Sequence, residues 1–326
     1  MTVLVTGAAG FIGMHVSAAL LSSGRNVLGV DSLNSYYDPA LKRARLAELS
    51  RYRSFAFAQA DIALEGAIGA AASGRRITAI VHLAAQPGVR YSIEHPAAYI
   101  EANLVGHFRV LEFARHLPDL SHLVYASSSS VYGAGTNLPF STTQRTDRPV
   151  SLYAATKASC ELMAYTYAHL YRIPATGLRF FTVYGPWGRP DMAVYGFTKA
   201  IFGGQPIRLF NGGAMKRDFT YIDDIVAGVT NCLERPPVSD GEGAPHRVYN
   251  LGNHRSEPLM RLVQVLEKAI GRQALTEPAA MQPGEVVETF ADIADARRDL
   301  GFEPTTSIDI GIPKFVEWYR RYHKID

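Results

Sequence analysis

Tyr153 and Lys157 are the residues whose types and spacing point most directly to chemistry. They lie four positions apart in the run SLYAATKASCELMAYTYAHLY, whose apolar residues recur at helical spacing, so both side chains project from one helix face. An ammonium beside a phenol favours the phenolate, which can accept a proton near neutral pH. Upstream, Ser127 to Ser130 follow a β-branched, aromatic stretch and would place small donors at a strand end opposite that helix. The pattern predicts an acid/base site.

The alternative for this pair is an exposed aromatic and a solvated lysine, because chance pairs at this spacing are common on helices. The N-terminal segment favours the catalytic interpretation. A β-branched run, Thr2 to Thr6, leads into the segment GAAGFIG and then into a helix reaching about Ser23. Such a turn brings a pyrophosphate onto a helix N-terminus, because glycines permit the tight turn and close backbone approach. A turn without a ligand is the other interpretation. The residues expected to contact a dinucleotide here are Gly7, Gly10, Phe11, Ile12 and Gly13.

Asp31 decides which dinucleotide is expected. It ends the predicted second strand, where a carboxylate accepts hydrogen bonds from an adenosine ribose and repels a 2′-phosphate. NAD is therefore expected in preference to NADP.

Composition excludes several functional classes. The 326 residues are 47% hydrophobic and 19% charged, which is typical of a globular protein with one large or two medium domains. The formal charge is +3 with scattered basic residues, so neither nucleic acid nor a membrane is an expected partner. No apolar run reaches the roughly 18 residues of a membrane span, and the initial strand leaves no room for a signal peptide. Cys160 and Cys232 are expected in the core, with no disulfide or metal, so a cytoplasmic location is predicted.

Alternating strands and helices predict an α/β fold with a doubly wound parallel Rossmann sheet and a smaller α/β C-terminal substrate lobe. We expect the dinucleotide domain to comprise 1–180 plus returns near 222–253, and the second lobe to comprise 181–221 and 254–326. Two amphipathic helices are expected after His254. The other expected strands are 26–30, 54–60, 78–83, 175–183 and 247–251, and the expected helices are 96–116, 152–171, 193–203 and 222–234.

Basic residues outside the predicted acid/base site have two interpretations. Lys42, Arg43 and Arg45 lie on a short basic helix and are expected to form a solvated face. Arg90 lies in the loop after the fourth strand, where it would reach a second ligand or form a structural ion pair. Both interpretations of Arg90 stay open.

Longer segments resemble the extended short-chain dehydrogenase/reductase family and, within it, the UDP-glucuronate 4-epimerases. The resemblance covers essentially the whole chain. It implies reversible conversion of UDP-glucuronate to UDP-galacturonate through a 4-keto intermediate and transient NADH. It also implies a homodimer formed through helices 96–116 and 152–171. The segments that carry it are DSLNSYYDPALKRARL, QPGVRYSI, YASSSSVYG, FFTVYGPWGRPDM, KRDFTYIDDI and MQPGEV.

The resemblance also implies roles for individual residues. Tyr153 would be the base for the 4-hydroxyl, Lys157 would support it and hold the nicotinamide ribose, and Ser128 would position the 4-oxygen. Further cofactor contacts are implied for Asn34, Asp61, Ile62, Leu83, Ala84, Ala85, Asn103 and Tyr153 itself. Substrate contacts are implied for Gln86, Arg90, Ser128, Ser129, Ser130, Thr182, Arg189, Arg217 and Glu285.

The substrate carboxylate poses a chemical problem. A 4-keto uronate is a β-keto acid, and it loses CO2 readily unless its carboxylate is held out of alignment with the carbonyl. Ser129, Ser130 and Thr182, with a charge-assisted bond from Arg189, are the expected clamp. Related dehydratases and decarboxylases place acidic residues just after the catalytic Ser/Thr, whereas this chain has Ser129, Ser130 and Val131 there. The chemistry is expected to stop at epimerisation.

The nucleotide end of the substrate has less specific signals. Arg217 matches an arginine that relatives use for the diphosphate, and its alternative is an ion pair with Asp218 or Asp223. Glu285 matches an acidic residue aimed at the uridine ribose, although the neighbouring arginine of the UDP-galactose 4-epimerases is Gln282 here.

Three other functions stay open. A UDP-glucose or UDP-N-acetylglucosamine 4-epimerase would share the mechanism. Thr289 lies where the UDP-galactose 4-epimerases carry a bulky gatekeeper residue, so a 2-acetamido group would also fit. The segment YGPWGRP argues against that reading. A UDP-glucuronate decarboxylase is the second alternative. A non-catalytic dinucleotide-sensing protein is the third, but such proteins usually lose the tyrosine or the lysine.

Overall fold

A parallel sheet of seven strands forms the centre of the larger part of the chain. The computed structural model describes residues 2–134, 137–239, 241, 243–282, 284 and 286–325. The strand order is β11-β6-β5-β4-β1-β2-β3, so the order reverses between β1 and β4, where doubly wound sheets bind ligands. The predicted α/β class is confirmed. The strands are β1 (Thr2–Thr6), β2 (Asn26–Asp31), β3 (Phe55–Gln59), β4 (Ile77–His82), β5 (His122–Ser128), β6 (Ala175–Phe180) and β11 (His246–Leu251).

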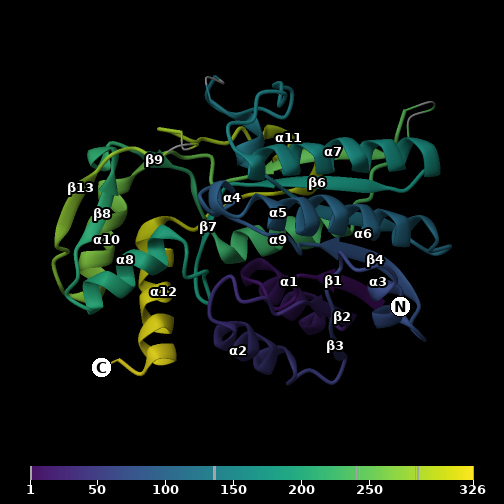
Figure 1. Ribbon diagram of the computed structural model, residues 1–326, viewed down its shortest axis with the longest axis horizontal. Helices are drawn as coiled ribbons and strands as arrows, with labels where there is room; N and C mark the ends of the chain where they lie inside the picture. The colour runs from purple at the N-terminus through teal and green to yellow at the C-terminus, as the bar shows by residue number, and fades with distance from the viewer. Residues whose placement is uncertain are drawn as a thin grey trace.

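Helices cover both faces of this sheet because its strands alternate apolar side chains between two cores (Figure 1). Val3 and Val5 of β1 belong to one buried cluster, whereas Leu4 between them belongs to the other. The first face packs against α1 (Phe11–Ser22), α2 (Pro39–Leu49), α9 (Ile222–Leu233) and α11 (Ala294–Leu300). The second face carries α3 (Ala67–Ala72), α4 (Tyr91–Glu94), α5 (Pro96–Tyr99), α6 (Gly106–Arg115) and α7 (Leu152–Tyr171).

A smaller lobe lies beyond the carboxyl ends of the sheet strands, on the left of Figure 1. Its strands form two-residue to four-residue ladders, β8 with β13 and β9 with β12. Helix α10 packs against α8 and α12 and gives the lobe its core. The elements are α8 (Ala193–Phe202), β8 (Ile207–Phe210), η3 (Asn211–Gly213), β9 (Lys216–Arg217), β12 (Glu257–Pro258), α10 (Leu259–Ile270), β13 (Thr276–Ala279) and α12 (Ile308–His323).

Three predicted elements are wrong in detail. The expected strand 175–183 is two strands, because the chain leaves the sheet after β6. The next strand, β7 (Thr182–Tyr184), pairs with β10 (Phe219–Tyr221) instead. The expected helix 96–116 is interrupted by the π-helical turn η1 (Ile100–Val105). The two amphipathic helices expected after residue 254 are α10 and α12, but the described residues contain a third helix between them, α11, which is only 7 residues long and too short to show an apolar period.

The basic residues of α2 also differ from expectation. Lys42 and Arg45 are buried, with 6% and 0% exposure, and only Arg43 is solvated. Lys42 donates to Asn34 Oδ1 at 2.7 Å, and Arg45 donates to the carbonyl of Ala9 at 3.0 Å. The helix therefore turns cations inward because the loops beneath it present oxygen acceptors.

Both cysteines are buried and free, as predicted. Among the residues that the structure describes, no helix has both the length and the apolar character needed to cross a bilayer.

Candidate active site

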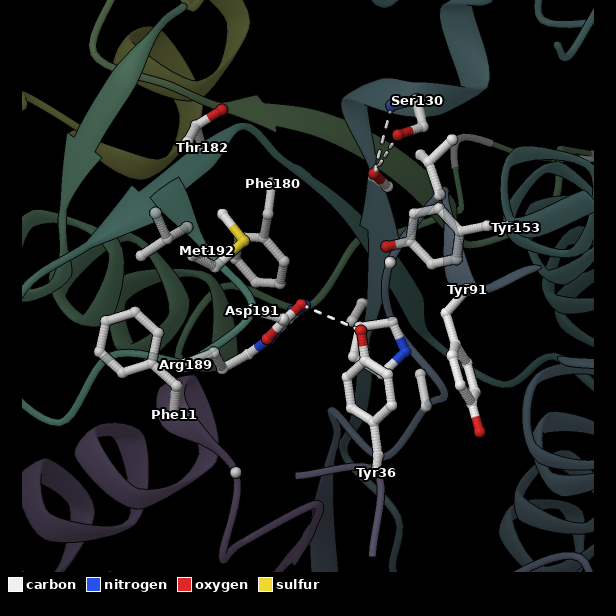
Figure 2. A pocket seen from close by; sticks show the side chains of 18 of the residues that line it. Phe11, Tyr36, Tyr91, Ser130, Tyr153, Phe180, Thr182, Arg189, Asp191 and Met192 are labelled. Carbon is white, nitrogen blue, oxygen red and sulfur yellow. Dashed lines mark hydrogen bonds and ion pairs between the residues drawn. The ribbon is translucent and has the colours of Figure 1, made fainter. Parts of the chain in front are cut away.

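A cavity of about 900 Å³ receives residues from the ends of β1, β5 and β6 and from the smaller lobe. Figure 2 shows the phenol of Tyr153 pointing into it below Ser130, with Arg189 and Asp191 on the opposite side. A cavity at the carboxyl ends of a parallel sheet, walled on one side by a second lobe, is where α/β proteins bind their ligands.

The predicted acid/base group comes together in this cavity. Ser151 caps α7 by accepting a hydrogen bond from Ala154 N at 3.1 Å, which starts the helix one residue before Tyr153. Lys157 is buried and donates to the carbonyl of Ala126 at 3.0 Å, next to the end of β5. Ser128 Oγ accepts from Ser130 N at 3.2 Å and caps the 3₁₀ turn η2 (Ser129–Tyr132). The turn brings the serine hydroxyls to the wall that faces α7.

A buried ion-pair network lies behind these serines, and sequence reasoning missed it. Glu161 of α7 receives two hydrogen bonds from Arg179 of β6, at 2.8 and 2.7 Å, and one from Ser127 Oγ at 2.5 Å. Arg179 also donates to Tyr132 at 2.9 Å. Although burial lowers the pKa of Arg179, its bonds to Glu161 raise that pKa above its ordinary value. The network joins α7, β5, β6 and η2, so it fixes the distance between the helix of Tyr153 and the strand of Ser128.

The N-terminal turn has the geometry of a dinucleotide site. Gly7 has φ +73°, and a Cβ there would lie 2.7 Å from Ala84 N; a Cβ on Gly13 would lie 2.0 Å from Gly7 O. Only glycine fits both positions. Asp31 ends β2 at the edge of this turn and accepts from Ala9 N at 3.1 Å. The close backbone approach and the carboxylate together suit a pyrophosphate and a ribose.

Most residues expected to contact the cofactor line the cavity, but Asn103 of that set is absent from its lining, and so is Gln86, which was expected to contact the substrate. Asn103 accepts from Gln86 N at 2.7 Å and donates to Gln86 O at 3.1 Å and to Thr156 at 3.0 Å. The amide of Asn103 therefore links helix α7 to the segment that follows β4. Asn103 and Gln86 support the cavity wall from behind. The expected cofactor residues that line the cavity are Gly7, Gly10, Phe11, Ile12, Gly13, Asp31, Asn34, Asp61, Ile62, Leu83, Ala84, Ala85, Tyr153 and Lys157.

Arg189 lines the cavity together with a partner that the sequence did not indicate. Its Nε donates to Asp191 Oδ1 at 3.0 Å and its Nη2 donates to Asp191 Oδ2, with side chains 23% and 25% exposed. Burial lowers the pKa of Arg189, but the neighbouring Asp191 carboxylate raises it by more, so the pKa lies above its ordinary value. Tyr36 donates to the same carboxylate at 3.1 Å. Only the neighbouring position of Asp191 in GRPDM could have suggested this pair.

The remaining predicted substrate residues come from several loops. Thr182 lies on β7, and Arg217 on β9 donates to Val287 O at 3.1 Å. Arg90 lies over the ring of Phe210 at 4.1 Å from its centroid. Glu285 lies outside the described residues. The expected substrate residues that line the cavity are Arg90, Ser128, Ser129, Ser130, Thr182, Arg189 and Arg217.

Asp218 organises the lobe side of the cavity. Its carboxylate accepts from Asn253 N at 2.5 Å and from Ala291 N at 3.1 Å, and its own N–H donates to Thr289 Oγ1 at 3.3 Å. Burial raises the pKa of Asp218 to about 6, although these N–H donors favour the carboxylate. The residue ties three loops together directly behind Arg217, and Thr289 stands beside it in the cavity wall.

Comparisons with known proteins agree with this geometry. The model of the NAD dependent epimerase/dehydratase family matches residues 3–252. Protein CapI of Staphylococcus aureus is 48% identical over 335 residues, covering 99% of this chain and 100% of that protein. A probable UDP-glucuronate 4-epimerase of Rhizobium meliloti is 45% identical over 338 residues, covering 99% and 98%.

A crystal structure gives the same result in three dimensions. The UDP-glucuronic acid 4-epimerase from Bacillus cereus, in complex with UDP-glucuronic acid and NAD, superposes with a TM-score of 0.90 at 34% identity. The superposition covers 99% of this chain and 100% of that one.

Proposed function

Because the chain belongs to the NAD dependent epimerase/dehydratase family, we propose that it interconverts UDP-glucuronate and UDP-galacturonate at C4, with NAD as its resident cofactor. The observation that carries the proposal is the meeting of Tyr153, Lys157 and Ser128 in a cavity that also contains the glycine turn and Asp31. The Bacillus cereus enzyme, similar over its full length, is described with UDP-glucuronic acid and NAD.

The chemistry needs one acid/base residue. Tyr153 takes the proton of the 4-hydroxyl as a 4-keto sugar forms, and it returns the proton when C4 is reduced from the other face. Bound NAD supplies the acceptor and donor of the hydride. Ser128 would position the 4-oxygen, and the ammonium of Lys157, held by Ala126 O, would support Tyr153 as the base and hold the nicotinamide ribose. Asp31 would hold the adenosine ribose, with the glycine turn against the pyrophosphate.

The carboxylate clamp extends this proposal to substrate choice. Ser129, Ser130 and Thr182 offer neutral donors from two walls of the cavity. Arg189 uses two of its five N–H donors on Asp191, and the others would serve the substrate carboxylate. The ion pair holds the guanidinium in one orientation, which is what pinning a β-keto carboxylate requires.

Replacing Arg189 with Gln tests the clamp. We expect the Kd for UDP-glucuronate to rise about 10-fold or more, because the substrate loses a charge-assisted hydrogen bond. The Kd for UDP-glucose should change little. Isothermal titration with both sugars on the same preparation measures the difference. Equal losses for the two sugars would remove the carboxylate from the role of Arg189.

Arg217 and Glu285 are proposed for the nucleotide end of the substrate, the arginine for the diphosphate and the carboxylate for the uridine ribose. Arg217 stands in the lobe wall of the cavity, beside the loop clamp of Asp218. On this proposal residues 1–180 with 222–253 serve the cofactor, and 181–221 with 254–326 serve the sugar nucleotide. Titration of Arg217→Gln with UDP checks the diphosphate role, since unchanged affinity would contradict it.

We also propose a homodimer through α6 and α7. Helix α7 exposes apolar side chains that a monomer would leave in water, Leu162 at 71% and Leu170 at 60%, and α6 adjoins it with Phe108 at 38%. Leu162→Arg should convert a dimer into the 35.7 kDa monomer in a sedimentation experiment. A monomeric wild type, or a variant that stays dimeric, would contradict this interface.

A cytoplasmic location is part of the same proposal. Two buried free cysteines suit a reducing compartment, where no disulfide framework is needed. Fractionation of the native host, with the protein followed by antibody, checks the location.

One incubation tests the activity itself. Purified protein is mixed with UDP-glucuronate without added NAD, and UDP-galacturonate, UDP-xylose and residual substrate are separated. UDP-galacturonate is the expected product. UDP-pentose as the main product would transfer the assignment to the decarboxylases, and conversion of UDP-glucose alone would transfer it to the neutral-sugar epimerases.

A further inference from the structure

A short segment on the substrate side of the cavity, Pro186 to Asp191, accepts hydrogen bonds from side chains of the cofactor side, while the ring of Trp187 packs against α12 of the smaller lobe. We propose that Tyr36 and Asp191 are positioning residues for Arg189, and that through them the loop after β2 controls how the substrate carboxylate is held. This inference rests on the proposed function and deepens it.

The chain of contacts begins next to the ribose carboxylate. Asp31 Oδ1 accepts from Leu33 N at 2.8 Å, which fixes the start of the loop, and Lys42 donates to Asn34 Oδ1 at 2.7 Å, which fixes its middle. Tyr36 follows two residues later and donates to Asp191 Oδ2 at 3.1 Å. A single hydrogen bond, from Tyr36 to Asp191, therefore connects the loop expected to contact the dinucleotide with the ion pair of Arg189 (Figure 2).

The ring of Tyr36 is itself fixed. It lies 4.8 Å from the ring of Tyr91, edge-on, and close to Gly88, where a Cβ would approach the hydroxyl to 2.8 Å. Burial and the neighbouring Asp191 raise the pKa of Tyr36, so its hydroxyl stays protonated and donates. A hydrogen bond from a fixed donor orients the Asp191 carboxylate, and the bidentate pair transmits that orientation to Arg189.

The rest of the segment is fastened from the same side. Arg45, with no exposed surface, donates to Ala9 O in the glycine turn at 3.0 Å and to Trp187 O at 2.6 Å. His15 of α1 bonds Pro186 O at 2.9 Å. Trp187 has φ +64°, a strained conformation for a non-glycine residue, and it persists because these contacts hold it. The segment cannot move away from the cofactor side without losing buried hydrogen bonds.

The consequence concerns the 4-keto intermediate. If Arg189 is poorly oriented, the carboxylate can rotate into line with the carbonyl and the C5–C6 bond breaks. Its electron pair forms the enolate across C5 and C4, C5 takes up a proton, and CO2 leaves. The 4-keto group already present is the electron acceptor, so no further oxidant is needed. Loosened positioning should therefore appear as CO2 release as well as weaker binding.

Tyr36→Phe tests this in the holoenzyme, because it removes one hydroxyl and leaves the Asp191 charge. We expect the Kd for UDP-glucuronate to rise roughly 10-fold, the Kd for UDP to stay within about 2-fold, and the share of ¹³CO2 from C6-labelled substrate to rise several-fold. Tyr249→Phe is the matched control: its hydroxyl also donates to an aspartate, Asp299, at 3.1 Å, but away from the cavity lining. The control should behave as wild type.

A double-mutant cycle shows whether Tyr36 acts through Asp191. In an Asp191→Ala background, Tyr36→Phe should cause no further CO2 release. Additive effects, unchanged CO2 release in Tyr36→Phe, or equal weakening of UDP and UDP-glucuronate would overturn the inference. Wild type that does not convert UDP-glucuronate would instead refute the proposed function, so the two failures are distinguishable.

Discussion

Tyr153→Phe is expected to lower turnover of UDP-glucuronate on the order of 10³-fold, the contribution typical of a positioned acid/base group. The substitution removes the hydroxyl and leaves a ring of the same shape in contact with Tyr99, whose centroid lies 6.0 Å away. The fold and the dinucleotide turn should be unaffected because neither depends on that hydroxyl. A discontinuous assay of UDP-galacturonate formation measures the turnover. The NAD content of the purified variant shows whether the dinucleotide site is unaffected.

The control for this variant is again Tyr249→Phe, which should keep wild-type turnover. Retained turnover in Tyr153→Phe would disprove its role as the base. Loss of turnover together with loss of bound NAD would make Tyr153 a cofactor-holding residue, with the proton transfer assigned elsewhere.

Glu161→Ala is expected to reduce the free energy of unfolding by about 3–5 kcal/mol, because it leaves a buried guanidinium without its carboxylate. Arg179 and Glu161 have side chains 5% and 10% exposed, so water cannot replace the lost partner. Ser127 loses its acceptor in the same step. Chemical denaturation followed by circular dichroism gives the change, and turnover should fall as well since the network fixes Ser128 relative to α7.

The matched control is an ion pair of similar length on the surface. Arg76 and Asp119 are 2.7 Å apart with side chains 63% and 45% exposed, so Asp119→Ala should hardly change the denaturation midpoint. Equal midpoints for Glu161→Ala and wild type would show that the buried pair is not required.

The parts of the fold that depend on local pattern were predictable from the sequence. Helix α7 begins and ends where its apolar spacing predicts, Leu152 to Tyr171, because capping by Ser151 and periodicity are local properties. The buried parallel strands were visible as β-branched runs for the same reason. Most expected site residues that converge on the cavity follow strand ends or lie on α7, so topology brings them together, whereas Arg217 comes from β9 of the smaller lobe.

Features that depend on distant partners were not predictable. From the sequence, the basic residues of α2 are expected to be solvated. Only the tertiary structure places the carbonyls of residues 9 and 187 within hydrogen-bonding distance of Arg45. The partner of Arg179 is 18 positions away on another element. The exit from the sheet after Phe180 depends on β10, which is nearly 40 positions later in the chain. Pairings of this kind are set by tertiary structure, so periodicity carries no sign of them.

The position of β11 has a consequence for biosynthesis. Strand β6 pairs with β5 on one side and with β11 on the other, and β11 begins only at His246. While the ribosome is still adding the smaller lobe's first elements, the outer backbone of β6 has no strand beside it. An open edge of this kind can pair with another nascent chain, so we expect the emerging polypeptide to be prone to association until residue 251 leaves the exit tunnel.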